Sequence, residues 1–260
     1  MESFHFDTRS VSLSGKNEGY STSRMPPMAR TLPTEKYSED VSDNRYVLKS
    51  GDYSIYLADI PSRRSEADAL VKRMYSWRGY YTESAVFSSR DPNQLTFVAT
   101  NAEHLAGTVT LGLDSEDCLL ADELYGQEIN AFRKKGRKVC ELSKFALDPQ
   151  YSSKEIIASL FHLAYIYARV IHNATDLFGE VNPRHARSQQ RMFGFRQVGN
   201  EPRICPRVGA PAVLLHLELD YVAAQISSLA GSREPGERSI YPYCASHQRE
   251  SSGNNIQNIN

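Results

Sequence analysis

The stretch KVCELSKFALD, residues 138–148, decides the fold, because it reads as a strand that carries polar residues on a mainly apolar face. Its residues alternate with the period of two that is typical of a strand, and the pattern ends before Pro149. Glu141 and Ser143 are unusual on such a face. The face is expected to contain Val139, Glu141, Ser143, Phe145 and Leu147.

The next segment, SSKEIIASLFHLAYIYARVIHN at 152–173, has the strongest helical pattern in the chain. Ser152 or Ser153 can cap its first turn. A strand followed by a capped helix offers edge amides to an extended, amide-bearing ligand and N-terminal N–H groups to an anion. The buried stripe of the helix is expected to contain Ile156, Leu160, Leu163, Ala164, Tyr167 and Ile171.

The other segments predict an α/β protein with a mixed, twisted sheet flanked by helices. On the helix at 65–81, Leu70, Met74 and Trp77 form a stripe that is expected in the core. The remaining elements are a strand at 53–60, a hairpin at 95–101 and 105–114, a helix at 121–136, a strand at 175–181, a short basic helix that ends at Gly194, and a strand at 210–220.

Composition limits the class of protein. The chain has 260 residues, 40% of them hydrophobic, and its formal net charge of -1 gives no overall attraction to nucleic acid or to an anionic membrane. It has no run of about 18 apolar residues and no export signal, so we expect a cytoplasmic protein without an integral membrane segment. No metal site or disulfide framework is expected from the widely spaced Cys118, Cys140, Cys205 and Cys244.

The two ends of the chain differ from its middle. Residues 1–45 and 231–260 are polar and lack sustained periodicity, so both are predicted to be disordered tails. A single domain is expected between them, at 46–230.

Three segments together resemble a known family. GTVTLGLDSEDCLLADELYGQEINAFRKKGRKVCELSKFALD (107–148), VNPRHARSQQRMFGFRQVG (181–199) and PRVGAPAVLL (206–215) are similar, in this order, to the N-acyl amino acid synthases. These enzymes are a branch of the GCN5-related N-acyltransferase (GNAT) superfamily. The resemblance covers about residues 53–225 and implies the GNAT fold.

The resemblance also implies a reaction. A fatty acyl group would move from the phosphopantetheine thioester of acyl carrier protein to the amino group of an amino acid, giving a product such as N-acyl tyrosine. Glu141, beside Ser143 in the cleft, would accept a proton from the amine or orient it, and N–H groups of residues 141–145 would stabilise the developing oxyanion. The alternative for Glu141 is a structural pairing with Lys144 or Arg137.

A more distant resemblance links the chain to the acyl-homoserine-lactone synthases. Their Glu-x-Ser-Arg-Phe strand resembles residues 141–145, with Lys144 in place of Arg and with Phe145 kept. An Arg followed four positions later by an aromatic residue resembles Arg73 and Trp77. The two resemblances imply substrate-binding roles for Arg73, Trp77, Lys144, Phe145, Asn182, Arg184 and His185.

The segment VNPRHARSQQ resembles the family pattern Asn-Pro-Arg-His-Ala-x-Phe-Tyr, but Ser188 and Gln189 replace Phe-Tyr. A tyrosine there often protonates the leaving thiolate in the wider superfamily, and Gln189 cannot. A thiol with a pKa of about 8.5 is nevertheless a tolerable leaving group. Arg184 and His185 either stabilise the turn and cap the helix, or Arg184 or Arg187 binds the acceptor carboxylate.

The identity of the donor is indicated by the loop before the long helix. Acetyltransferases that use coenzyme A hold its pyrophosphate with a glycine-rich loop there, whereas DPQYSSKE (148–155) has no glycine. This favours acyl-phosphopantetheine on acyl carrier protein as donor and no permanently bound cofactor. Because that carrier is acidic, a basic docking patch is expected at Arg133, Lys134, Lys135, Arg137 and Lys138.

Three alternatives stay open at this level. The chain could be an acyl-homoserine-lactone synthase that uses S-adenosylmethionine, or a coenzyme A-dependent acetyltransferase. It could also be a non-catalytic acyl-binding or regulatory module of the same fold.

Overall fold

Eight strands form one mixed sheet in the described part of the chain, which in this computed structural model comprises residues 46–82, 91–102, 104–232 and 236–244. Their order is β1-β2-β3-β4-β5-β6-β8-β7, and within those residues β5 and β6 form the single parallel pair. The predicted α/β fold is confirmed. The strands are β1 (Tyr46–Ser50), β2 (Tyr53–Leu57), β3 (Gln94–Asn101), β4 (His104–Leu113), β5 (Val139–Leu147), β6 (Asp176–Val181), β7 (Arg196–Cys205) and β8 (Ala210–Glu218).

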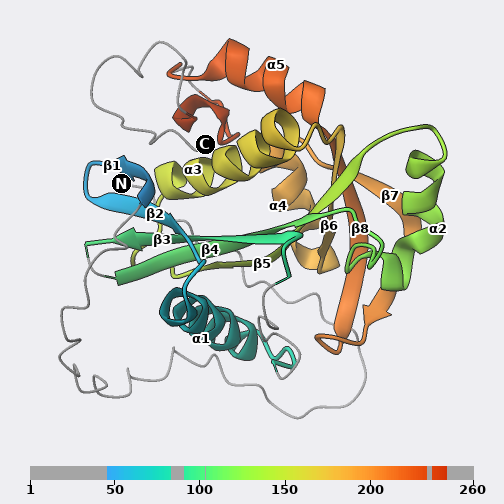
Figure 1. Ribbon diagram of the computed structural model, residues 1–260, viewed down its shortest axis with the longest axis horizontal. Coiled ribbons are helices and arrows are strands. Elements are labelled where there is room, and N and C mark those ends of the chain that lie inside the picture. The colour runs from blue at the N-terminus through green and yellow to red at the C-terminus, as the bar shows by residue number, and fades with distance from the viewer. Residues whose placement is uncertain (1–45, 83–90, 103, 233–235, 245–260) are drawn as a thin grey trace. The chain divides into compact units, whose positions relative to one another are not determined.

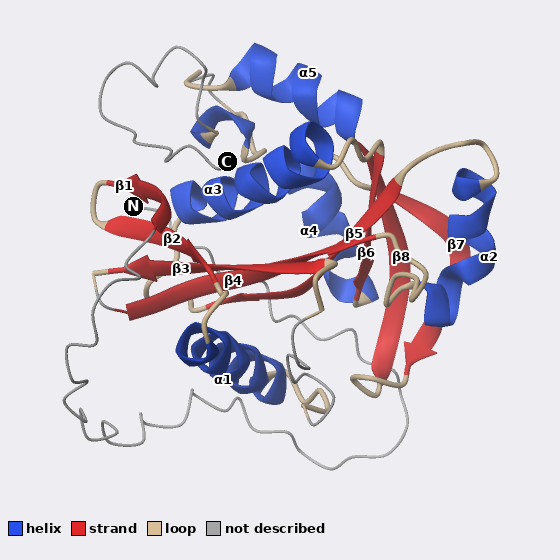
Figure 2. Ribbon diagram, in the orientation of Figure 1, coloured by secondary structure: helices blue, strands red, loops and turns tan. Residues whose placement is uncertain are grey.

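Helices cover both faces of the sheet (Figure 1, Figure 2). The largest apolar cluster lies on the face covered by α3 and α5, and α1 packs on the opposite face. Nearer the other end of the sheet, α2 packs against Val139, Phe178 and Leu214. The helices are α1 (Pro61–Trp77), α2 (Asp122–Arg133), α3 (Lys154–Tyr165), the π-helix η2 (Ile166–Ile171), α4 (Pro183–Phe193), α5 (Leu219–Leu229) and the 3-10 helix η3 (Tyr241–Tyr243).

The long helix begins as predicted but changes form. Ser153 is its N-cap, and its hydroxyl accepts a hydrogen bond from the Ile156 N–H at 3.3 Å. From Ile166 the chain continues as a π-helix, whose wider turn changes the direction of the side chains. Ile171, predicted to be buried, is therefore 46% exposed, whereas the rest of the predicted stripe is buried.

The predicted core stripe of α1 is only partly correct. Leu70 and Met74 are buried, but Trp77 is the last residue of the helix and is 48% exposed. Ala67 and Val71 complete the buried face of this helix.

Three elements lie outside the sequence prediction: β1, β7 and α5. β7 is an edge strand that contains Gly199 and Pro202, and its register shifts between Val198 and Arg203, so it lacks the alternation by which a strand is recognised. The strand predicted at 210–220 ends at Glu218, and α5 follows directly.

The predicted C-terminal tail is wrong for residues 236–244. Tyr241 is 1% exposed, and its hydroxyl donates to the Phe193 carbonyl at 2.6 Å. Ile240 is also buried in the main cluster. The predictions for residues 1–45 and 245–260 lie outside the described residues. None of the helices described here combines the length and apolar character needed to cross a membrane.

A buried carboxylate joins the paired ends of β5 and β6. Asp176, the first residue of β6, accepts hydrogen bonds from Arg137, His216 and Thr175 at 2.5–3.0 Å. Burial alone would raise the pKa of Asp176, but these three donors outweigh it and hold the pKa well below its usual range. The network fixes the two strands where they pair.

We predict that Asp176→Asn lowers the free energy of unfolding by about 3 kcal/mol at pH 7, because the change removes one partner of a buried ion pair. The depressed pKa means that the contribution is complete above the pKa of an unfolded aspartate, about 3.9, and is lost as the pH falls below it. Urea unfolding should therefore show that the difference in free energy of unfolding between wild type and Asp176→Asn becomes smaller from pH 7 to pH 3.

Asp220→Asn is the matched control, because Asp220 is 68% exposed and pairs with Arg169 at the surface. It should cost less than about 1 kcal/mol at every pH. Equal effects of the two changes would contradict a structural role for the Asp176 network.

Candidate active site

A bulge interrupts β5 at its centre. Thr108 pairs with Ala146 and Thr110 pairs with Ser143, so two residues of β5, Lys144 and Phe145, lie opposite Val109 alone. Lys144 has a left-handed φ of 50°, as a bulge of this kind requires. The strand bends here and its alternation of side chains changes phase.

The change of phase corrects the predicted face of β5. Glu141 and Ser143 precede the bulge and keep the face of Val139, which packs toward α2. Phe145 and Leu147 follow the bulge and pack into the α3 core with Cys140 and Leu142. The expectation that Phe145 and Leu147 share a face with Glu141 is therefore wrong.

Beyond Glu141, β5 and β6 part. They pair from Val139–Asp176 to Glu141–Phe178, after which β5 continues along β4 and β6 continues along β8 (Figure 1). We call this divergence the splay. Its closed end lies at the start of both strands, and its open end lies where β5 leads toward α3 and β6 leads into α4. Among the described residues no strand pairs with the β6 edge of β5 from Leu142 onward, so a ligand can pair with it there.

Glu141 is fixed at the closed end of the splay. It is 4% exposed, and its two carboxylate oxygens accept the N–H groups of Leu120 at 2.9 Å and Ala121 at 3.0 Å. Burial raises the pKa of Glu141, and these two N–H groups oppose part of the rise. The alternative pairing with Arg137 is wrong, because Arg137 is bound to Asp176.

A cavity of about 200 Å³ lies beside the Glu141 carboxylate. Gly112, opposite Glu141 on β4, leaves the room for it, since a Cβ there would lie 3.1 Å from Glu141 Oε1. Asp91 and Asp117 also line the cavity, which therefore has an acidic wall suited to an ammonium group. Burial lowers the pKa of Lys144, and Glu141 and Asp91 oppose that shift.

Glu180 and Arg207 were not predicted, although a glutamate at the end of the apolar strand DLFGEV is a detectable signal. Glu180 lies on β6 two residues after Phe178, on the sheet face of Glu141 and Ser143. Arg207 donates to Glu180, to Glu123 and to the Leu120 carbonyl. Burial raises the pKa of Glu180 to about 7; Arg207 opposes the rise, and Glu141 and Glu123 add to it.

Two buried atoms in this group have no hydrogen-bond partner among the described residues. They are Ser143 Oγ on β5 and Glu180 Oε1 on β6, one on each side of the splay. Buried polar atoms are rarely left unpaired, so a further polar group, either a water or a ligand, can bind to these two atoms. Glu141 and Ser143, predicted together from the sequence, do lie on one face of the same strand.

At the open end of the splay, Asn182 is the N-cap of α4 and its side chain accepts the Arg184 N–H at 3.2 Å. Arg184 donates to the Tyr80 hydroxyl at 2.9 Å and to His185 Nε2 at 3.3 Å. Burial, with the charges of Arg184 and Arg78, lowers the pKa of His185 to about 4, so its imidazole is neutral near pH 7. The helix cap is therefore supplied by Asn182 and not by the Arg184 or His185 side chain, to which the capping alternative was assigned, and substrate binding by these residues stays a prediction.

The loop before α3 is closed by its own hydrogen bonds. Asp148 accepts the Gln150 N–H through its carboxylate at 2.9 Å and the Ser152 N–H through its carbonyl at 2.9 Å. Arg73, predicted to bind substrate, instead contacts the buried Asp148 carboxylate at 2.6 Å. Trp77 lies at the end of the same helix, on the surface.

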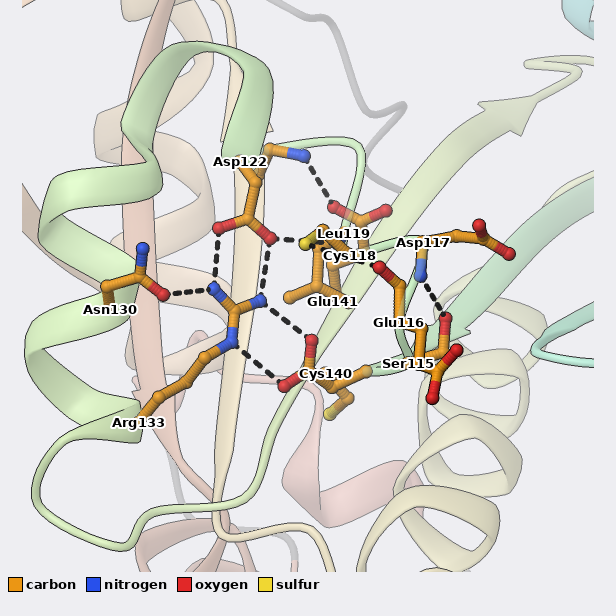
Figure 3. Close-up of polar contacts among 12 residues, drawn as sticks. Ser115, Glu116, Asp117, Cys118, Leu119, Asp122, Asn130, Arg133, Cys140 and Glu141 are labelled. Atoms are coloured by element: carbon orange, nitrogen blue, oxygen red, sulfur yellow. Dashed lines mark hydrogen bonds and ion pairs between the residues drawn. The ribbon is translucent and has the colours of Figure 1, made fainter.

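The predicted docking patch is divided by internal ion pairs. Arg133 donates to Asp114 and Asp122, as Figure 3 shows for Asp122, and Arg137 is bound to Asp176. Among these five residues, Lys134, Lys135 and Lys138 are exposed. They lie just before β5, at the closed end of the splay.

Comparisons with known proteins identify similar chains. A family model described as N-acyl amino acid synthase FeeM matches residues 66–218. The solved structure of FeeM, an N-acyl amino acid synthase from uncultured soil microbes, has 29% identity and a TM-score of 0.58, and the match covers 65% of this chain and 91% of FeeM. The AHL synthase LasI has 12% identity and a TM-score of 0.45 over 64% of this chain and 90% of its own. No protein of curated function matches.

We predict that Glu141→Gln lowers the free energy of unfolding by about 1–3 kcal/mol, because an amide nitrogen would then face the N–H group of Leu120 or Ala121. Urea unfolding measures the loss, and amide exchange at Leu120 and Ala121 should quicken. Ser143→Ala is the matched control on the same strand face: it removes a hydroxyl without a described partner and should be neutral or stabilising. A loss at Ser143 as large as that at Glu141 would contradict this description.

Proposed function

Because this chain belongs to the FeeM family of N-acyl amino acid synthases, it is an N-acyltransferase, and we propose that it transfers a long-chain fatty acyl group from acyl carrier protein to the amino group of an amino acid. The observation that carries the proposal is the splay between β5 and β6. An extended phosphopantetheine arm, which contains two amide groups, can lie there and pair with the free edge of β5 as an added strand. The thioester would then stand near Glu141 and Ser143.

The closed loop before α3 supports a carrier-bound donor. In this loop the Gln150 and Ser152 N–H groups are already bound by Asp148, and an aspartate carboxylate occupies the position where a pyrophosphate would need donors. A donor without an adenosine diphosphate portion does not need that site. Acyl-phosphopantetheine on acyl carrier protein meets this condition.

The carrier must dock where its arm can enter the splay. The lysines at 134, 135 and 138 lie at the closed end, away from the entrance for the arm. Their docking role, predicted from charge density, stays a prediction that their position does not favour. At the open end, α4 exposes Arg187 and Arg191 on one side of the helix. These two arginines form a basic surface on the helix that follows β6 at the entrance.

The acceptor amine must lose a proton before it attacks the thioester. We assign this step to the carboxylates of Glu141 and Glu180, which lie on one sheet face; burial raises the pKa of Glu180, and the charge of Glu141 adds to the rise. Glu141 lines the cavity and faces the amine, while Glu180 keeps the pair partly protonated near neutral pH. Ser143 and the N–H groups of β5 are placed to stabilise the developing oxyanion.

The reaction is tested with purified chain, acyl carrier protein loaded with acyl groups of 8 to 16 carbons, and a mixture of the twenty amino acids, followed by mass spectrometry. We expect N-acyl amino acids from acyl carrier protein, and rates lower by at least about 10-fold from the matching acyl-coenzyme A. Release of methylthioadenosine on addition of S-adenosylmethionine would favour a lactone synthase. Absence of any product with folded protein would contradict the proposal and favour a non-catalytic module.

The pH dependence of kcat/KM tests the carboxylate pair. We predict a fall below about pH 7, because protonation of the pair removes the proton acceptor. Glu141→Gln should lower kcat/KM by about 100-fold at pH 8. Glu180→Gln should retain more activity and move the acidic limb to lower pH, because loss of a like charge lowers the pKa of Glu141. If kcat/KM of Glu180→Gln falls at the same pH as that of wild type, the charge coupling between Glu180 and Glu141 is refuted.

A further inference from the structure

A second polar cluster lies at the open end of the splay, where the end of α1 meets the start of α4. It comprises Arg78, Tyr80, Arg184 and His185, none of which takes part in the proton transfer described above. The Tyr81 N–H donates to the Val208 carbonyl at 3.0 Å, which ties the segment after α1 to the turn between β7 and β8. The cluster therefore stands beside the C-terminal end of β6.

The two guanidinium groups of this cluster are held in place by neutral partners. Arg184 donates to the Tyr80 hydroxyl at 2.9 Å and lies over the Tyr80 ring, 5.3 Å from its centroid. Arg78 donates to the Met74 carbonyl at 3.3 Å and lies 5.4 Å from the Trp77 ring. Tyr80 packs edge-on against Tyr75, with ring centroids 5.8 Å apart. The cationic groups are thus positioned before any ligand arrives.

Within the described residues, neither Arg78 nor Arg184 forms an ion pair with a carboxylate. Arg133, Arg137, Arg203 and Arg207, by contrast, all have carboxylate partners. Burial lowers the pKa of Arg78, and the charge of Arg184 adds to the shift, so the two cations repel each other at a half-buried site. An oxyanion bound between them would relieve this repulsion and accept several N–H donors at once.

We propose that Arg78 and Arg184, with the Tyr80 hydroxyl, form a binding site for an oxyanion, and that under the proposed function this oxyanion is the α-carboxylate of the acceptor amino acid. A planar guanidinium matches a carboxylate in bidentate geometry, which is why two arginines suit this ligand. Such a site would hold the acceptor by its carboxylate at the mouth of the splay, beside the C-terminal end of β6.

The phosphodiester of the phosphopantetheine arm has the same oxyanion chemistry and enters by the same end. The two sources differ in the substrate that loses affinity when an arginine is removed. A carboxylate ligand predicts a loss confined to the amino acid, whereas a phosphodiester predicts a loss confined to the acyl carrier protein. Steady-state kinetics with both substrates varied separates them.

The experiment compares wild type, Arg78→Gln and Arg184→Gln with the best acceptor amino acid and with its α-carboxamide, which has no carboxylate. Arg196→Gln is the matched control, because Arg196 is exposed on β7 and lies level with Phe178 at the closed end of the splay, outside the cluster. We expect both cluster variants to raise KM for the amino acid about 10- to 100-fold, with little change for the carboxamide, as expected for charge-assisted hydrogen bonds. The control should behave as wild type.

A readout that needs no activity uses inorganic phosphate as the probe. Phosphate should raise the thermal unfolding temperature of wild type and Arg196→Gln above that in chloride of equal ionic strength, because a ligand that binds only the folded state stabilises it. Arg78→Gln and Arg184→Gln should lose most of this increment. The comparison between variants removes the general stabilisation that phosphate gives any protein.

The outcomes are distinct. A raised KM for acyl carrier protein with unchanged preference for acid over amide would support the site and identify the donor phosphate as its ligand. Unchanged kinetics together with an equal phosphate increment in all four proteins would overturn the site. If wild type transfers no acyl group, the proposed function fails, and the phosphate increment alone still decides whether the oxyanion site exists.

Discussion

The bulge at Lys144 is the constraint on which the rest of the site depends. A regular β5 would stay in register with both neighbours, and the sheet would close over its full length. With one extra residue opposite Val109, β5 stays paired with β4 while it bends away from β6 after Glu141. The direction of Phe145 into the core follows from this single insertion, and β5 leaves β6 just before it, between Glu141 and Lys144.

The buried polar groups at the two ends of the splay differ in how fully they are hydrogen-bonded. At the closed end, Asp176 is saturated by three donors and Glu141 by two backbone N–H groups, so this end is rigid. Further along, Ser143 Oγ and Glu180 Oε1 have no described partner, and at the open end Arg78 and Arg184 repel each other and have no carboxylate partner among the described residues. The fully hydrogen-bonded carboxylates fix the strands in place. The groups without a described partner are where an amine and an oxyanion would bind.

Much of this could be predicted from the sequence, because local patterns carry it. The alternation of β5 identified Glu141 and Ser143, the Ser153 cap and apolar stripe identified α3, and the Asn182-Pro183 turn identified the start of α4. The failures come from features that alternation does not encode: the bulge that reverses Phe145 and Leu147, the π-helix that exposes Ile171, and an edge strand with a proline. Glu180, Arg207 and Arg78 join the site only through tertiary contacts of segments distant in sequence, which no local spacing reveals.

The central claim is that an acyl-phosphopantetheine arm lies along the free edge of β5. The most direct measurement is amide hydrogen exchange with and without a non-hydrolysable acyl-pantetheine analogue. The account predicts slower exchange confined to N–H groups of residues 142–146 and of the start of α4, because these become hydrogen-bonded to or covered by the arm. Protection elsewhere on the sheet, with the β5 amides unchanged, would contradict it.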